Sequence, residues 1–316
     1  MTNGSNLDEL RADGSWRLTW SGGRLDEAVF RLAPDPAAGR RALVRRLGTD
    51  AADPEQWEAA LIEALLTDPA AAGLRRLELH LTDFHHSARR AAQALATRSR
   101  ERLTILYFGH DFEHLYEHHH TSTGGVIDPL SRLHDGFVDD ARNGMWQALP
   151  ALRELTAAGG LLFDDIDSES LTDLRLRGAL LAHGGIFPAK APGLVTLQLE
   201  IRTDVFGTAC PAEQLEELDP AGYPRLRHLD LGRSEFDAGD LGTLRALADS
   251  PILPQLETLR INSLRIQPYE ADGDPLDALR GLAPAFAHLA LSVAGEIEVA
   301  GATRADVIRV LPIANT

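Results

Sequence analysis

Residues 226–231 read Leu-Arg-His-Leu-Asp-Leu, and this pattern decides the fold because it recurs along the chain. The copies at residues 256–261 (LETLRI) and 286–291 (FAHLAL) each follow thirty residues after the one before. Residues 194–199 (LVTLQL) and 74–79 (LRRLEL) place apolar residues in the same order. A fixed period near thirty residues is typical of repeat architectures, in which each unit buries its apolar face only against its neighbours.

The spacing of the apolar positions predicts a short strand in each copy. The last two apolar residues of the pattern face the same side of a strand, because side chains alternate. Further copies start at Leu103, Leu152 and Leu171, and the regular period breaks between residues 109 and 150. We therefore expect an α/β fold with stacked parallel strands, an outer layer of helices and right-handed crossovers.

This pattern resembles the leucine-rich repeat family, whose signature begins Leu-x-x-Leu-x-Leu. The resemblance covers about residues 74–299, and repeats of this length are similar to the ribonuclease-inhibitor-like branch. It implies a solenoid with a curved parallel sheet and outer helices. The family usually places Asn or Cys three residues after the pattern, where the side chain bonds to backbone. Here that position holds Thr82, Arg202, Ser234, Leu264 and Ala294. Of these, Thr82 and Ser234 can still make the bond.

The repeat array divides the chain into four predicted regions. Residues 1–14 form a flexible tail, and residues 15–73 form an N-terminal cap of a β-hairpin plus helices, one near residues 40–47. Residues 74–300 form the array, with a histidine-rich insertion at 109–148. Residues 301–316 form a C-terminal cap that contains a helix over 303–310. A last strand is predicted at 297–299, and helices near 238–248 and 275–282 separate the last three repeats.

The composition excludes several classes of partner. The formal net charge is -16 and the pI is about 5.1, which argues against nucleic acid as a partner. This acidity is compatible with a basic protein partner, and it also serves solubility alone, which is the favoured interpretation. No apolar run reaches the ~20 residues that span a bilayer, and residues 1–15 lack a secretory signal. Cys210 is the single cysteine, so no intramolecular disulfide can form. We expect a cytoplasmic location, and the scarcity of lysine favours a bacterial source.

The family resemblance implies recognition of a protein or peptide on the concave sheet face. We expect no enzymatic activity and no cofactor, because the sequence lacks a nucleophile constellation and the repeat array is unbroken from Leu194 onward. The middle position of each pattern should point out of that face, where Arg and Tyr are frequent in binding hot spots. The predicted contact residues are Glu78, Tyr107, Arg175, Gln198, Asp230 and Arg260. Thr156 and Ala290 occupy the same position in their repeats, and His80, Glu200 and Asn262 lie one step further along. The alternative is a merely solvated sheet face.

The histidine-rich insertion supports a second hypothesis. His114 and His118 are four residues apart, so a helix would place both on one face, and His110 would extend that face by one turn. These three histidines are the candidate ligands for zinc, nickel or iron in a metal-dependent enzyme or metal sensor. The insertion lacks the H-E-x-x-H motif of zinc enzymes. A solvated loop and a histidine pH switch are further interpretations, as is an acidic protein that blocks a basic partner.

Overall fold

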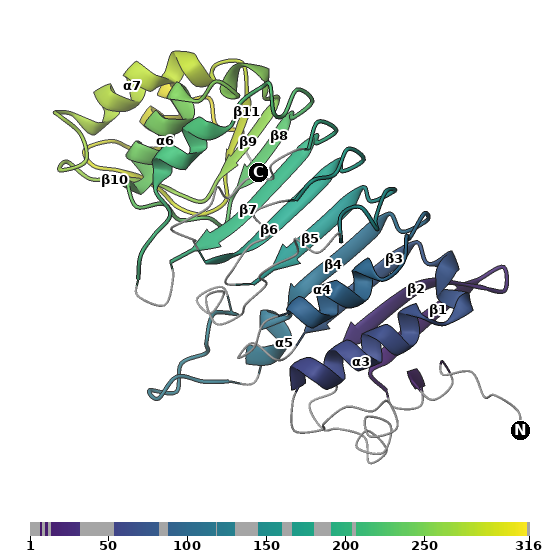
Figure 1. Ribbon diagram of the computed structural model, residues 1–316. Coiled ribbons are helices and arrows are strands. Elements are labelled where there is room, and N and C mark those ends of the chain that lie inside the picture. The colour runs from purple at the N-terminus through teal and green to yellow at the C-terminus, as the bar shows by residue number, and fades with distance from the viewer. Residues whose placement is uncertain are drawn as a thin grey trace, which may run out of the picture.

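The computed structural model describes residues 7, 10–11, 14–31, 54–81, 88–117, 119–129, 145–159, 166–179, 191–203 and 207–314. Ten strands form one long sheet (Figure 1). In spatial order they are β1 (Trp16–Ser21), β2 (Arg24–Arg31), β3 (Arg76–Leu81), β4 (Ile105–His110), β5 (Glu154–Ala158), β6 (Asp173–Ala179), β7 (Thr196–Arg202), β8 (His228–Leu231), β9 (Thr258–Ile261) and β11 (Ala290–Val293). From β2 onward every neighbouring pair is parallel.

The register of the sheet follows the repeat. One leucine from each of eight strands falls in a single line across the sheet, and none of the eight is more than 2% exposed. These residues are Leu77, Leu106, Leu155, Leu174, Leu197, Leu229, Leu259 and Leu291. Burying a leucine side chain stabilises the fold by about 1.5–3 kcal/mol, so this line contributes strongly to the core.

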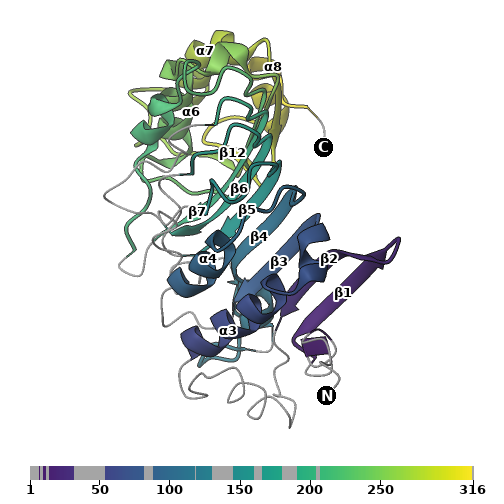
Figure 2. The ribbon, with the colours of Figure 1, turned by 45° about the vertical axis from the view of Figure 1, so that its right-hand side comes forward.

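Helices cover one face of the sheet (Figures 1 and 2). They are α3 (Pro54–Leu66), α4 (Arg89–Ala96), α6 (Gly239–Asp249), α7 (Pro275–Phe286) and α8 (Arg304–Val310), with the 3-10 turns η1 (Pro69–Gly73), η3 (Ala212–Glu217) and η4 (Leu253–Gln255). Neighbours in the chain pack together, α3 against α4 and α6 against both η3 and α7. The chain is thus a mixed α/β protein with a repeat-like, solenoid-like arrangement. Over the described ranges, no helix is both long and apolar enough to cross a membrane.

The predicted hairpin at the N-terminus is confirmed. Strands β1 and β2 pair antiparallel around a turn at Gly22 and Gly23, whose φ angles are 56° and 77°. Trp16 packs on Phe30 with ring centroids 5.0 Å apart. Strand β2 pairs parallel with β3, so the hairpin extends the sheet at its edge, as Figure 2 shows. The helix expected near residues 40–47 lies outside the described residues.

The C-terminal end differs from the prediction in its register. Phe286 is the last residue of α7 and not the start of a strand pattern. Strand β11 instead aligns Leu291 with Leu259, so Ser292 lies beside Arg260 in the place expected for Ala290. The strand predicted at 297–299 forms, as β12 (Ile297–Val299), but it pairs with β10 (Leu264–Ile266) in a separate two-stranded sheet. The predicted last helix, α8, forms behind a capping box.

Ser234 makes the backbone contacts expected at its position after the repeat pattern. Its buried hydroxyl donates to the carbonyl oxygen of Leu199 at 2.6 Å and accepts from the amide of Ile201 at 3.1 Å. Both partners belong to the neighbouring strand β7, so the side chain joins two successive repeats. Thr82, the other residue expected to bond in this way, lies outside the described residues.

Candidate functional site

The six side chains predicted to point out of the concave face lie in one row on the sheet face opposite the helices. The strand register places them side by side across β3 to β9, with Thr156 completing the row on β5. In strand order the row is Glu78, Tyr107, Thr156, Arg175, Gln198, Asp230 and Arg260. Alternation along a strand was sufficient to predict this placement. The role of these residues in binding stays a prediction.

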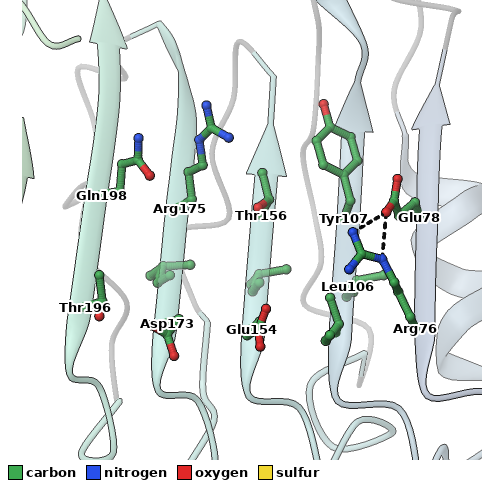
Figure 3. A pocket seen from close by; sticks show the side chains of 13 residues that line it. Arg76, Glu78, Leu106, Tyr107, Glu154, Thr156, Asp173, Arg175, Thr196 and Gln198 are labelled. Carbon is green, nitrogen blue, oxygen red and sulfur yellow. Dashed lines mark hydrogen bonds and ion pairs between the residues drawn. The ribbon is translucent and has the colours of Figure 1, made fainter. Parts of the chain in front are cut away.

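A second row lies two residues earlier on each strand and shares the same face. It contains Arg76, Ile105, Glu154, Asp173 and Thr196. The two rows line a groove that crosses β3 to β7 and has a volume of about 400 Å³. Figure 3 shows the short Thr156 side chain between the longer Tyr107 and Arg175. The small side chain on β5 therefore hollows the middle of the groove.

Two carboxylates in the groove stand directly beside each other. Glu154 on β5 and Asp173 on β6 are partners in the strand register, and both are exposed. The Thr172 hydroxyl donates to Asp173 at 2.7 Å. Neither carboxylate forms an ion pair with any residue that the structure describes, although Arg75 lies within electrostatic reach of Glu154. We call Glu154 and Asp173 the acidic pair.

The charges next to Arg175 are compensated within the protein. Glu200 on β7 is fully buried and accepts from the Arg175 Nε at 2.9 Å and from the Arg177 Nε at 2.7 Å. The Gln198 amide also donates to it, at 3.1 Å. Arg177 is itself only 4% exposed and pairs with Glu113 as well. Because a buried charge is costly unless paired, these residues form a fixed wall. The prediction of Arg175 as a simple solvent-facing contact is thus incomplete.

The segment after β4 crosses the carboxyl ends of several strands. It comprises residues 111–116, includes the short helix α5 (Phe112–Tyr116), and is called the clasp below. At one side Asp111 pairs with Arg31 of β2 and lies 3.3 Å from the His80 Nδ1 of β3. At the other side Glu113 pairs with Arg177 of β6. The clasp therefore connects strands from β2 to β6.

Small residues leave room for the clasp. Gly109 of β4 and Ala158 of β5 lie side by side in the register, between His80 and Arg177. Gly109 has a φ of 143°, and a Cβ atom there would lie 1.9 Å from the Ala158 carbonyl oxygen. Phe112 is fully buried and packs with Tyr116, apart from the main core. Glycine is thus required where the chain leaves β4.

Electrostatic contacts fix the protonation of the side chains under the clasp. A hydrogen bond with His80 is the main reason that the pKa of Glu78 falls to about 2, and Arg76 adds to the effect. Burial lowers the pKa of His80, but the contact with the Asp111 carboxylate and the hydrogen bond with Glu78 outweigh it, so this pKa is raised overall. Burial raises the pKa of Tyr107, whose ring stacks on His80 with centroids 4.2 Å apart. Tyr107 is therefore a neutral aromatic wall of the groove.

The predicted histidine face is not formed by His110 and His114. His110 ends strand β4 and is fully buried, whereas His114 belongs to α5, so the two do not share a helix. The helix prediction failed because the apolar strand pattern continues through Phe108 to His110. His118 lies outside the described residues. In the part of the chain that the structure describes, no three His, Cys, Asp or Glu side chains are grouped as metal ligands.

The row ends in a second compensated pair beyond the groove. The Asp230 carboxylate accepts from the Gly232 amide at 2.8 Å and lies 3.6 Å from the Arg260 Nη1.

Sequence reasoning missed the acidic pair and the clasp contacts. The acidic pair carries a usable signal, because the third residue of each repeat pattern faces the same side as the fifth. The Glu113–Arg177 contact, 64 residues apart in the chain, has none.

No family model and no curated protein matches this chain. A protein from Bacteroides fragilis, known from a crystal structure, is similar to it with a TM-score of 0.54 and 17% sequence identity. The match covers 80% of this chain and 68% of that one. At this level of identity the likeness shows the fold alone, a mixed α/β arrangement with a long, mostly parallel sheet.

Proposed function

We propose that this chain is a leucine-rich-repeat-like binding protein that holds an extended segment of a partner protein in the groove across β3 to β7. The repeat assignment is supported by the single line of buried leucines and by the backbone contacts of Ser234. Both features are those that the family resemblance implies. The single observation that carries the binding role is the groove itself, an open hollow of about 400 Å³ on the face opposite α3, α4, α6 and α7.

The walls of the groove favour binding over catalysis. Its basic side chains are held in ion pairs, Arg76 with Glu78 and Arg175 with Glu200, and are not poised as acids or electrophiles. Burial raises the pKa of Cys210 to about 12, which makes this thiol a poor nucleophile. The paired guanidinium groups of Arg76 and Arg175, with a neutral aromatic ring between them, suit recognition, because such side chains lose little freedom when a partner binds.

Filling the groove tests this function without breaking an ion pair. Thr156→Trp places a large side chain on the floor of the groove. Arg245→Trp adds the same side chain on the exposed surface of α6, in the helix layer, and serves as the control. By contrast, Arg175→Glu would set a carboxylate against the buried Glu200 and confound folding with binding.

The experiment begins with affinity capture from the source cells, and the captured partner is then purified and titrated by calorimetry. We expect Thr156→Trp to weaken its binding at least about tenfold, because a filled hollow excludes the partner. Arg245→Trp should bind as the wild type does. Equal affinity of the wild type and Thr156→Trp, with all three proteins folded by circular dichroism, would contradict groove binding.

A further inference from the structure

In the described part of the groove, the positive charges are paired with carboxylates of the protein, whereas two of the negative charges are not. Arg76 and Arg175 each bond a carboxylate of the protein at close range. The acidic pair has no such partner among the described residues, and the nearby Arg75 directs its guanidinium to Asp26, 3.2 Å away. The groove therefore presents two unpaired negative charges and no unpaired positive one among its described lining residues.

The register makes the acidic pair an unfavourable neighbour contact in the free protein. Strands in a sheet lie about 4.8 Å apart, and like charges directly opposite each other destabilise the pairing. A cation placed between Glu154 and Asp173 would reverse the sign of that interaction. Both carboxylates are held in place on adjacent, hydrogen-bonded strands before a cation binds, so little conformational freedom is lost when the contact forms.

The surroundings of the acidic pair suit a cationic side chain with an apolar stem. Ile105 is the neighbour of Glu154 in the same row and is only half-buried, so it offers apolar surface beside the carboxylates. Lysine and arginine lay their methylene groups along such surface while the charged end remains polar. Thr196 continues the row on the other side of Asp173 and contributes a hydroxyl group.

We propose that the groove recognises an extended peptide segment through one lysine or arginine side chain, which binds between Glu154 and Asp173. This proposal rests on the proposed function and specifies its partner. From β3 to β7 the groove crosses four strand spacings, or about 19 Å, which an extended chain of about six residues spans. The net charge of -16 also attracts a basic segment from a distance.

A library of random heptapeptides displayed on phage is the probe, used with EDTA present so that no metal ion bridges the carboxylates. The full-length wild type, the charge-neutral Glu154→Gln/Asp173→Asn variant and a control are each used for selection. The control, Glu216→Gln/Glu217→Gln, removes the same charge from the exposed side of η3. Neutralising the acidic pair also removes a repulsion, so this variant should fold at least as well as the wild type.

We expect the wild type and the control to enrich peptides with lysine or arginine at one fixed position, and the charge-neutral variant to lose that preference. In a synthetic copy of a selected peptide, replacing this residue with glutamine should weaken wild-type binding at least about tenfold. The same replacement should change binding to the charge-neutral variant less than about threefold. This difference separates a direct charge contact from a general effect of acidity.

Three kinds of result would overturn the proposal in distinguishable ways. If the wild type enriches peptides without a basic position, and Thr156→Trp no longer binds them, the groove binds peptides but the acidic pair does not bind a cationic side chain. If Thr156→Trp binds the selected peptides as the wild type does, or the wild type enriches none, groove binding itself is refuted. If the charge-neutral variant enriches peptides with the same basic position, the acidic pair is not the group that recognises the basic residue.

Discussion

Replacing Gly109 with alanine should destabilise the protein far more than an ordinary glycine substitution. The φ of 143° at this residue lies in a region that is nearly exclusive to glycine, and occupying it costs a side-chain-bearing residue about 1–3 kcal/mol. The added Cβ would also lie 1.9 Å from the Ala158 carbonyl oxygen, so β4 and β5 would have to separate by more than 1 Å. Such a shift breaks ladder hydrogen bonds and unseats the clasp. We expect a total loss of about 4 kcal/mol or more.

The matched control is Gly301→Ala. Gly301 also has a positive φ, 77°, but no atom lies within 4 Å of the position of its missing Cβ. It should therefore lose only the ~1–2 kcal/mol that a left-handed backbone costs. Urea unfolding followed by far-ultraviolet circular dichroism measures both variants against the wild type. A loss in Gly109→Ala no larger than that in Gly301→Ala would refute the close approach of β4 and β5.

Three further predictions concern single side chains. Glu200→Gln should cost about 3 kcal/mol in urea unfolding, because it leaves the buried Arg177 with one fewer negative partner, whereas the exposed Glu217→Gln should cost less than about 0.5 kcal/mol. The pKa of Glu78 is lowered from 4.5 to about 2, so its ionised form stabilises the fold above pH 4.5, and this stabilisation is lost as the pH falls toward 2. The difference in unfolding free energy between the wild type and Glu78→Gln should therefore shrink over that pH range. A difference that stays constant would contradict this prediction. The Cys210 thiol, with its pKa raised to about 12, should react with Ellman's reagent slowly in the native protein and quickly in guanidinium, and rapid native reaction would show that it is accessible.

The repeat pattern was sufficient to predict the long sheet, because apolar positions that face one core must keep the strand period. It placed Leu229 and Leu259 in one line and Tyr107 beside Glu78. It failed at Phe286, where an apolar residue belonging to the end of α7 imitates the first position of a strand pattern. Apolar spacing alone cannot separate these cases, since helix ends and strand starts both bury such residues.

The sequence predicted which sheet face the site residues occupy, but not which residues they form ion pairs with. Alternation placed Arg175 on the correct face, yet its capture by Glu200 depends on a neighbouring strand 25 residues away. The histidine spacing predicts a helix at His110, but the preceding strand pattern continues through this residue, which ends β4. The contacts of Glu113 depend on how the chain turns after Gly109, which the sequence does not specify locally. Pairings between distant segments follow from tertiary packing, and a single sequence carries little information about them.

The clasp has a mechanical consequence. In a stack where each strand contacts only its neighbours, small rotations between adjacent strands add up along the whole sheet, because no contact joins distant strands. By joining β2 and β3 to β6, the clasp locks the span that contains most of the groove, and within the described part of the chain the ion pairs of Asp111 and Glu113 reach no strand beyond β6. Because Glu200 of β7 is held by Arg175 and Arg177 of β6, flexing of the sheet should concentrate on the C-terminal side of β7. The hollow that holds the acidic pair would thus keep its shape while the rest of the stack yields.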